Sequence, residues 1–133
     1  MVVFLLCETV REELGNKLSL LGLFTSNRIL APADTTTVLL PSLTLLFIVN
    51  GGEGSFRTSL TLFAPSGKAL AEPTPRDVPL VPGTGRNLIF NFVPFSTDEF
   101  GEYHAILRMD GTEYSRRFSL VKDEARAGEA PSG

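Results

Sequence analysis

The sequence contains no tryptophan, one cysteine, one histidine and no excess of basic residues. A single cysteine excludes an internal disulfide, and one cysteine with one histidine cannot assemble a structural zinc site. The formal net charge of −3 argues against nucleic acid as a main partner, because binding to phosphates needs a surplus of Lys and Arg. We therefore expect no metal, no cofactor and no nucleic-acid partner.

Long apolar runs are also missing. No window approaches the roughly 18 apolar residues of a membrane helix, so we expect no association with a membrane. The apolar run that begins at Val2 has no Lys or Arg before it, and the bulky Leu6 stands before Cys7, which is unlike a lipoprotein signal. A domain of this size without disulfides suits the reducing cytoplasm, where we expect the protein to act.

Catalytic motifs are a third absence. The sequence holds no GxSxG elbow, and any Ser-His or Cys-His site would have to use His104. The apolar neighbours of Cys7 are expected to raise the pKa of its thiol and to lower its reactivity. Residues 83–86 lack the Lys-Ser/Thr pair of a phosphate-binding loop and are interpreted as a turn. We expect no catalytic residues and no enzymatic activity.

The sequence does contain many short runs of alternating apolar and polar residues, separated by turns rich in Gly, Pro and Asn. This pattern, with no sustained 3.6-residue period, predicts one all-β domain for a chain of 133 residues. We predict an immunoglobulin-like antiparallel β-sandwich of seven to eight strands over residues 1–121, with a polar flexible tail over residues 122–133. The expected strands cover residues 2–11, 18–24, 43–50, 56–63 and 88–93 and both halves of residues 101–121. Residues 28–31 continue as a bent or separate strand, and residues 36–40 are a short β-like piece within a connection.

The first two strands are expected to be central. Residues 2–7 are all apolar, and leucines occupy both alternating phases of residues 18–24, which is typical of strands buried on both faces. The short turn between them predicts an antiparallel hairpin. Residues 71–86 carry four prolines. Because proline removes ladder donors, this segment is expected to be a surface crossover rather than a central strand.

Residues 101–121 have the most regular pattern in the chain. Two alternating runs flank Asp110-Gly111, a dipeptide typical of two-residue hairpin turns. The resulting register puts Tyr103 opposite Phe118 on a mostly apolar face and leaves the other face polar. The sequence therefore predicts a half-buried antiparallel hairpin.

The start of this hairpin resembles the tyrosine corner of immunoglobulin-type domains. In that corner an acid, a small residue and a tyrosine precede a strand at two-residue steps, and Glu99, Gly101 and Tyr103 stand at that spacing here. The resemblance implies a sandwich in which the Tyr103 hydroxyl bonds the backbone. Ala105 stands where antibody domains carry cysteine, and an eight-stranded C2-like or jelly-roll sandwich is the main competing architecture.

Arg116 falls on the apolar face of the hairpin, opposite Ala105. A charge at that position needs a partner within the chain or a place at a sheet edge, or else it belongs to an interface. We therefore select Arg116, together with Arg117, Tyr114 and His104, as the candidate interface.

A sandwich with long strand edges and no catalytic motif is typical of an interaction module. We predict a non-enzymatic interaction or structural module that self-associates, its partner being a second copy of the chain or another protein. Two alternatives stay open. One is a small-ligand-binding or enzymatic domain with a pocket between the sheets or beside residues 73–85, and the other is a phage or extracytoplasmic accessory domain.

The first strands resemble the opening of a known family. The stretches CETVREE at residues 7–13 and GNKLSLLGLF at residues 15–24 are similar to the start of a family of small uncharacterised bacterial proteins. The resemblance implies a bacterial or phage-encoded β-sandwich domain of unknown function. It brings no catalytic residues with it.

Overall fold

Almost all of the described chain is β-structure. The computed structural model describes residues 2–15, 17–71 and 74–123. Within these ranges the helical content is one short 3-10 turn, η1 at Thr25–Asn27, and no helix is long and apolar enough to cross a membrane. The all-β prediction is therefore confirmed. The strands are β1 (Val2–Glu13), β2 (Lys17–Leu23), β3 (Arg28–Ala31), β4 (Val38–Leu40), β5 (Leu43–Val49), β6 (Gly54–Phe63), β7 (Ala69–Ala71), β8 (Arg76–Leu80), β9 (Arg86–Phe92), β10 (Phe95–Thr97), β11 (Gly101–Met109) and β12 (Thr112–Lys122).

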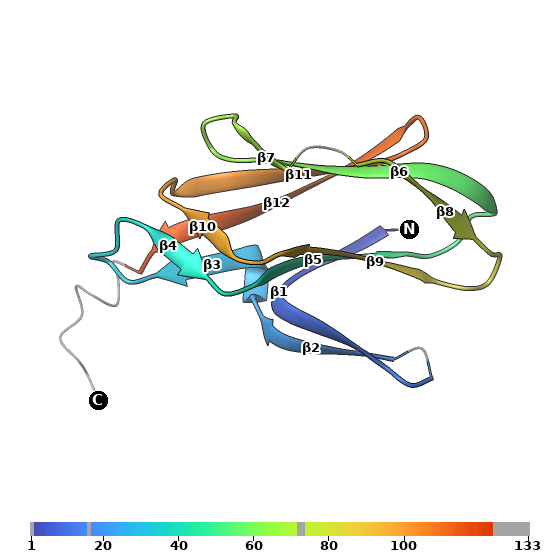
Figure 1. Cartoon of the computed structure of the whole chain (residues 1–133), viewed down its shortest axis with the longest axis horizontal. Helices are drawn as coiled ribbons and strands as arrows, with labels where there is room; N and C mark the ends of the chain where they lie inside the picture. The colour runs from blue at the N-terminus through green and yellow to red at the C-terminus, as the bar shows by residue number, and fades with distance from the viewer. Residues whose placement is uncertain (1, 16, 72–73, 124–133) are drawn as a thin grey trace.

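Two sheets are stacked face to face (Figure 1). The first, here called the β5 sheet, is antiparallel and has the strand order β2-β1-β5-β9. The second, the β11 sheet, has the order β3-β12-β11-β6-β7, with β8 also paired to β6. Its β3–β12 pair is parallel. The short strands β10 and β4 form a separate pair at one end of the stack.

The core fills the space between the two sheets. Leu45 and Phe47 of the β5 sheet and Leu107 of the β11 sheet are fully buried there. Tyr103 and Phe118 stack with ring centroids 5.0 Å apart and an angle of 6° between their planes. Since burying one such side chain contributes about 1.5–3 kcal/mol, this layer supplies the main drive to fold.

The β11–β12 hairpin has the register that the sequence predicts. Tyr103 pairs with Phe118, and the turn falls at Asp110-Gly111. Asp110 adopts a left-handed φ of 52°, and its Oδ1 accepts a hydrogen bond of 2.7 Å from the backbone N–H of Arg57. The turn is thereby fastened to the neighbouring strand β6.

The Tyr103 hydroxyl makes the backbone contact that its corner position implies. It donates to the carbonyl oxygen of Glu99 at 2.7 Å and lies 2.7 Å from the hydroxyl oxygen of Thr97. The same Thr97 oxygen accepts a hydrogen bond from the Glu99 N–H at 3.1 Å. A buried phenol costs free energy unless it is hydrogen-bonded, and here these bonds fix the turn before β11.

The described residues form twelve strands, where the sequence predicts seven or eight. Among those that the sequence does not reveal, β7 and β10 span three residues each, which is too short for a clear alternation. The proline-rich segment contains β8, in which Pro79 takes part in pairing with β6. β8 is peripheral, as a strand with proline must be.

The last strand that the structure describes extends just past residue 121. β12 continues to Lys122, whose ammonium lies 5.0 Å from the centroid of the Phe100 ring. Residues 124–133, which make up most of the expected flexible tail, lie outside the described residues.

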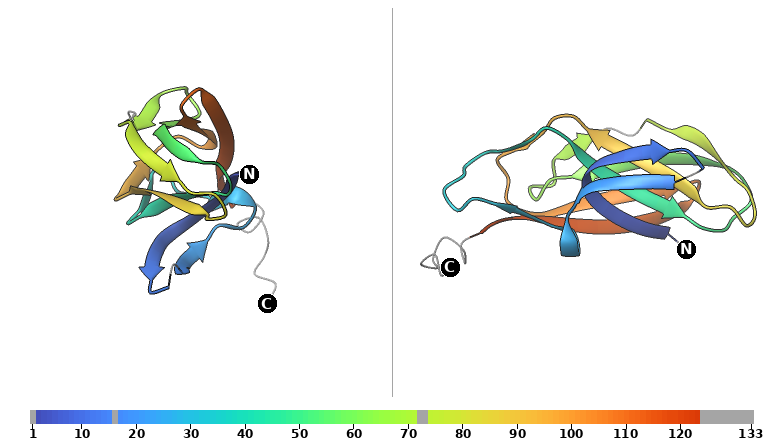
Figure 2. Two further views of the ribbon diagram at one scale, coloured as in Figure 1. Left: turned by 90° about the vertical axis from the view of Figure 1, so that its right-hand side faces the viewer. Right: turned by 90° about the horizontal axis from the view of Figure 1, so that it is seen from below.

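The first two strands differ from expectation. β1 pairs with β5 from Val2 to Cys7, Cys7 also pairs with Leu23 of β2, and from Thr9 to Glu13 the strand pairs with β2 alone. Residues 8–15 and 17–23 thus form a two-stranded hairpin, here called the arm, that projects out of the layers (Figure 1 and Figure 2, left). The hairpin pairing is confirmed, but the prediction that β2 is a central strand is wrong. β2 is an edge strand, because the charged second half of β1 carries the pair into solvent.

Candidate functional site

Two of the four candidate interface residues lie on the outer face of the β11 sheet. His104 is hydrogen-bonded through Nε2 to the hydroxyl of Ser115. The Arg117 guanidinium donates to a carboxylate oxygen of Glu102 at 2.6 Å, and both of these side chains are more than half exposed. Exposed ion pairs of this kind contribute little to stability, so this polar face remains accessible for contact.

The other two candidates, Tyr114 and Arg116, lie on the opposite face of β12 and are partly buried. The Arg116 guanidinium donates to the carbonyl oxygen of Val2 at 3.0 Å and to that of Ser115 at 2.8 Å. The inward charge is therefore satisfied by backbone oxygens of the same chain. This bond also ties β12 to the first residue of β1, so Arg116 holds the two sheets together at this edge. A role of these four residues in an interface stays a prediction.

The single cysteine has the features of a packing residue. Cys7 is fully buried, and its thiol lies 3.7 Å from the carbonyl oxygen of Thr9. Burial raises the pKa of the thiol, which keeps it protonated and weakly nucleophilic. In the described ranges of the chain, no three His, Cys, Asp or Glu side chains are gathered to hold a metal ion.

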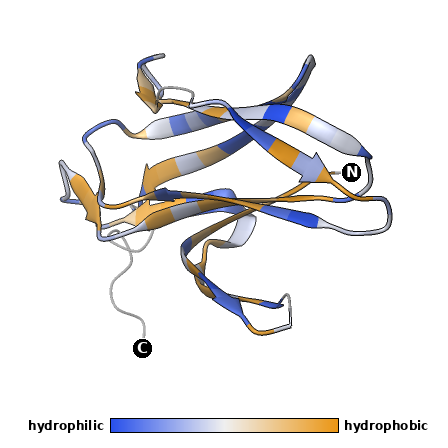
Figure 3. Cartoon of the chain, turned by 45° about the vertical axis from the view of Figure 1, so that its right-hand side comes forward, coloured by the Kyte–Doolittle hydropathy of each residue, from blue (hydrophilic) through white to orange (hydrophobic). Residues whose placement is uncertain are grey.

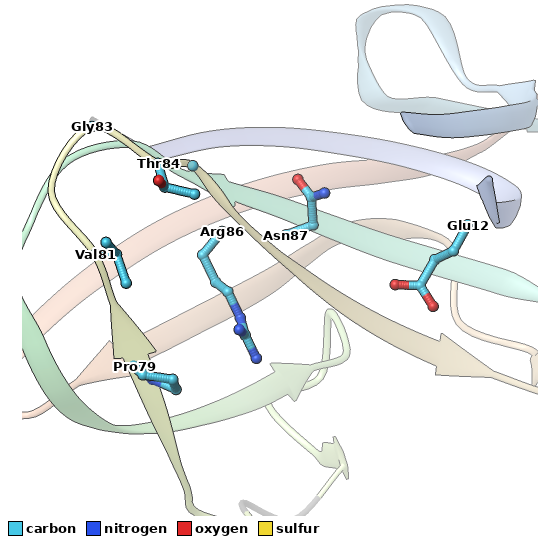
Figure 4. A pocket seen from close by; sticks show the side chains of 8 residues that line it. Glu12, Pro79, Val81, Gly83, Thr84, Arg86 and Asn87 are labelled. Carbon is cyan, nitrogen blue, oxygen red and sulfur yellow. The ribbon is translucent and has the colours of Figure 1, made fainter. Parts of the chain in front are cut away.

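A groove of about 740 Å³ opens between the arm and the connection from β8 to β9 (Figure 4). Glu12 of the arm and Arg86 and Asn87 of β9 line it, together with Thr84 and Pro79. These five residues are all exposed, whereas catalytic acids and bases are usually partly desolvated. The alternative of a ligand pocket beside residues 73–85 stays a prediction, and this groove is where it would lie.

The arm carries three of the seven large hydrophobic side chains that are exposed among the described residues. Leu14 at its tip is 92% exposed, and Leu21 and Leu23 on β2 are each 51% exposed. Hydrophobic residues recur along the arm as they do along the strands of the two layers (Figure 3). In the layers these side chains face a second sheet, whereas on the arm they face water.

The base of the arm is fixed by hydrogen bonds. The hydroxyls of Ser42 and Thr44 donate to the carbonyl oxygen of Glu8 at 2.7 and 3.2 Å, and Thr9 and Ser42 are linked through their hydroxyl oxygens at 3.0 Å. Opposite, Gly22 has a φ of +68°, and a Cβ there would lie 2.7 Å from Cδ of Glu8. The left-handed φ favours glycine at this position, at the base of the arm.

Sequence reasoning misses the arm as an exposed element. The available signal is the charge on Glu8, Arg11, Glu12 and Glu13, which marks the second half of β1 as solvated. A strand paired to a solvated strand is itself exposed unless another layer covers it. The leucines of β2 obscure this signal, because leucines on both faces of a strand are also typical of a central strand.

The comparisons with known proteins agree with the resemblance seen in the first strands. A model of a family of unknown function, DUF6941, matches residues 2–121, a range that includes the arm and both sheets. No curated protein matches the sequence. Because the family model spans nearly the whole chain, the protein belongs to the family of unknown function DUF6941.

Proposed function

We propose that this protein is a non-enzymatic interaction module that self-associates in the cytoplasm. The observation that carries the proposal is the arm, whose Leu14, Leu21 and Leu23 stand at least half exposed outside the core. Removing apolar surface from water gains about 25 cal/mol per Å². A projecting element with several such side chains is therefore stabilised when a partner covers it.

Two features support a role that does not involve catalysis. The sole cysteine is buried with a raised pKa. The sole histidine is hydrogen-bonded to Ser115 on a polar sheet face. The groups most suited to act as nucleophile or base are therefore engaged in packing and in a surface hydrogen bond.

We further propose that the two stacked sheets have an immunoglobulin-like arrangement. The Tyr103 hydroxyl donates to the Glu99 carbonyl four residues upstream, as in the tyrosine corner of such domains. We retain His104 and Arg117 on the outer polar face, and Tyr114 and Arg116 on the opposite face of β12, as candidate contact residues. A bacterial or phage-encoded origin is part of the same proposal.

Light scattering coupled to size exclusion tests self-association directly. At micromolar concentration we expect the mass of a dimer or larger, and dilution should shift the mass toward that of one chain. A mass of one chain at every micromolar concentration would overturn the proposal.

A further inference from the structure

Edge strands differ in how well they are protected. An edge presents unpaired N–H and C=O groups, and proteins guard it with charge, proline or shortness. β9 carries Arg86, β8 carries Pro79, and β3 carries Arg28 within four residues. β4, β7 and β10 have three residues each. Residues 18–23 of β2 and residues 87–92 of β9 both have no charge and no proline, and each strand has one charge at its first residue. Arg76 of β8 lies 5.6 Å from the centroid of the Phe90 ring of β9, whereas the edge of β2 lies on the projecting arm, away from both layers.

The position of this edge makes it accessible. β2 forms the outer strand of the arm, and the arm projects away from both layers (Figure 2). A second strand can therefore approach β2 without contact between the bodies of two molecules. A hairpin of two strands is only marginally stable in water, and a further strand would stabilise it.

We propose that two copies of this chain pair through β2, edge to edge and antiparallel, which joins their β5 sheets into one continuous sheet. The inference rests on the proposed self-association and names the strand through which the copies meet. An antiparallel pair of identical strands is related by a two-fold axis normal to the sheet. Such an interface is closed, so association stops at a dimer.

The residue pattern of β2 fits its own copy. With the axis at Leu20, this residue faces Leu20 of the second copy. Leu18 falls opposite Gly22, whose left-handed φ of +68° departs from the extended strand. Val10 is paired with Leu20 inside the arm, so one apolar row crosses all four strands. Cross-strand apolar pairs of this kind stabilise sheets.

Charge is compatible with the same register. Lys17 is the only charged residue of β2, and it falls opposite Leu23 of the second copy. The two Lys17 ammonium groups then lie at opposite ends of the paired strands. On the second face, Leu21 falls beside Ser19, and no like charges meet on β2.

The first experiment compares Leu20→Lys with the matched control Leu39→Lys. Leu20→Lys places two like charges directly across the axis, and we expect the dimer dissociation constant to rise by about 100-fold. Leu39 is 65% exposed on the short strand β4, so Leu39→Lys should leave the dissociation constant unchanged. Circular dichroism and the melting temperature check that both variants are folded.

The second experiment uses cross-linking and does not depend on Leu20→Lys being folded. In Leu20→Cys the new thiols of two copies meet at the axis, within reach of a disulfide, and mild oxidation should give a covalent dimer. The native thiol of Cys7 is buried and should not react. Leu39→Cys, the matched control, should stay mostly uncross-linked.

The outcomes separate the two proposals. A wild-type dimer that is lost in Leu20→Lys and trapped in Leu20→Cys supports pairing through β2. A wild-type dimer that persists in folded Leu20→Lys, or that Leu20→Cys does not trap, overturns this inference and leaves self-association intact. A wild-type monomer overturns both.

Discussion

The two-layered body and the arm contain the same kinds of residue in different surroundings. Leu45 of β5 and Leu107 of β11 are fully buried, whereas Leu21 and Leu23 of the arm are half exposed. In both the body and the arm, alternating residues form β-strands. Only the body has a second sheet that covers these residues, and the alternation along one strand does not show whether such a sheet is present.

β1 shows the contrast within a single strand. Its first residues pair with β5 inside the stack, and its last residues pair only with β2 in the arm. The change occurs at Cys7, whose neighbour Glu8 gives its carbonyl oxygen to Ser42 and Thr44. The body is therefore held by buried area, and the arm is held by its base and, in our proposal, by a second copy.

The largest expected effect is the difference in the free energy of unfolding between a leucine substitution in the body and one in the arm. Leu107→Ala leaves a cavity between the sheets, and we expect the free energy of unfolding to fall by about 2–5 kcal/mol. Leu21→Ala removes an exposed side chain, so in dilute protein the loss should stay within about 0.5 kcal/mol. Urea unfolding followed by circular dichroism measures both. Equal losses would show that the arm is packed like the body.

The fold could be predicted where an alternation of apolar and polar residues flanks a recognisable turn. Asp110-Gly111 fixes the register of residues 101–121, so the pairing of Tyr103 with Phe118 follows from the sequence. β2 could not be placed in this way, because leucine on both phases suits a central strand and an exposed arm alike. A layer is a tertiary feature, and local propensity does not report it.

The candidate site illustrates a different limit. The sequence indicates that Arg116 needs a partner, but that partner is the carbonyl oxygen of Val2, 114 residues away. Every residue offers the same backbone acceptor, so no side-chain pattern could identify it. The sequence shows that residues 18–23 contain no charge and no proline, but only the structure shows that β2 lies at the edge of its sheet.

The second effect concerns the tie between β12 and β1. Arg116→Met keeps the aliphatic stem and removes the hydrogen bonds of the guanidinium, so we expect the free energy of unfolding to fall by about 1.5 kcal/mol. Arg117→Met is the matched control, because it removes only an exposed ion pair and should cost less than about 1 kcal/mol. Urea unfolding and light scattering are measured together. Unchanged stability with a weakened dimer would instead place Arg116 in the interface.

The third effect tests the corner of the body. Tyr103→Phe removes a buried hydroxyl that bonds Glu99 and Thr97, and we expect a loss of about 1 kcal/mol. Tyr114→Phe, at the partly exposed tyrosine, should cost less. A urea midpoint that does not move in Tyr103→Phe would argue against a structural role for the corner.

The Tyr114→Phe variant also allows an alkaline titration of Tyr103 alone. The chain has two tyrosines and no tryptophan, so tyrosinate absorbance then reports one residue. Burial raises the pKa of Tyr103 in the folded protein, so the unfolded chain loses this proton first and stability falls as pH rises above about 10. We expect absorbance to rise together with unfolding. A phenol that ionises at about pH 10 in folded protein would contradict the burial of this ring.

The smallest effect should appear at acid pH, at the other end of the same corner. The side chain and backbone N–H of Ser66 both bond Glu99 and hold the pKa of this carboxyl below its usual range; the N–H donates to Oε1 at 2.9 Å. A depressed folded pKa gives stability that is present above the unfolded pKa, about 4.3, and is lost as pH falls through the folded value. Glu99→Gln should therefore flatten the decline of unfolding free energy between about pH 5 and pH 3, measured by urea midpoints.

The contact joins the turn after β6 to the corner before β11, so a flattened slope would show that the body depends on a polar bond at this turn. Identical slopes for the two proteins would mean that the Ser66–Glu99 contact contributes nothing to the stability of the body.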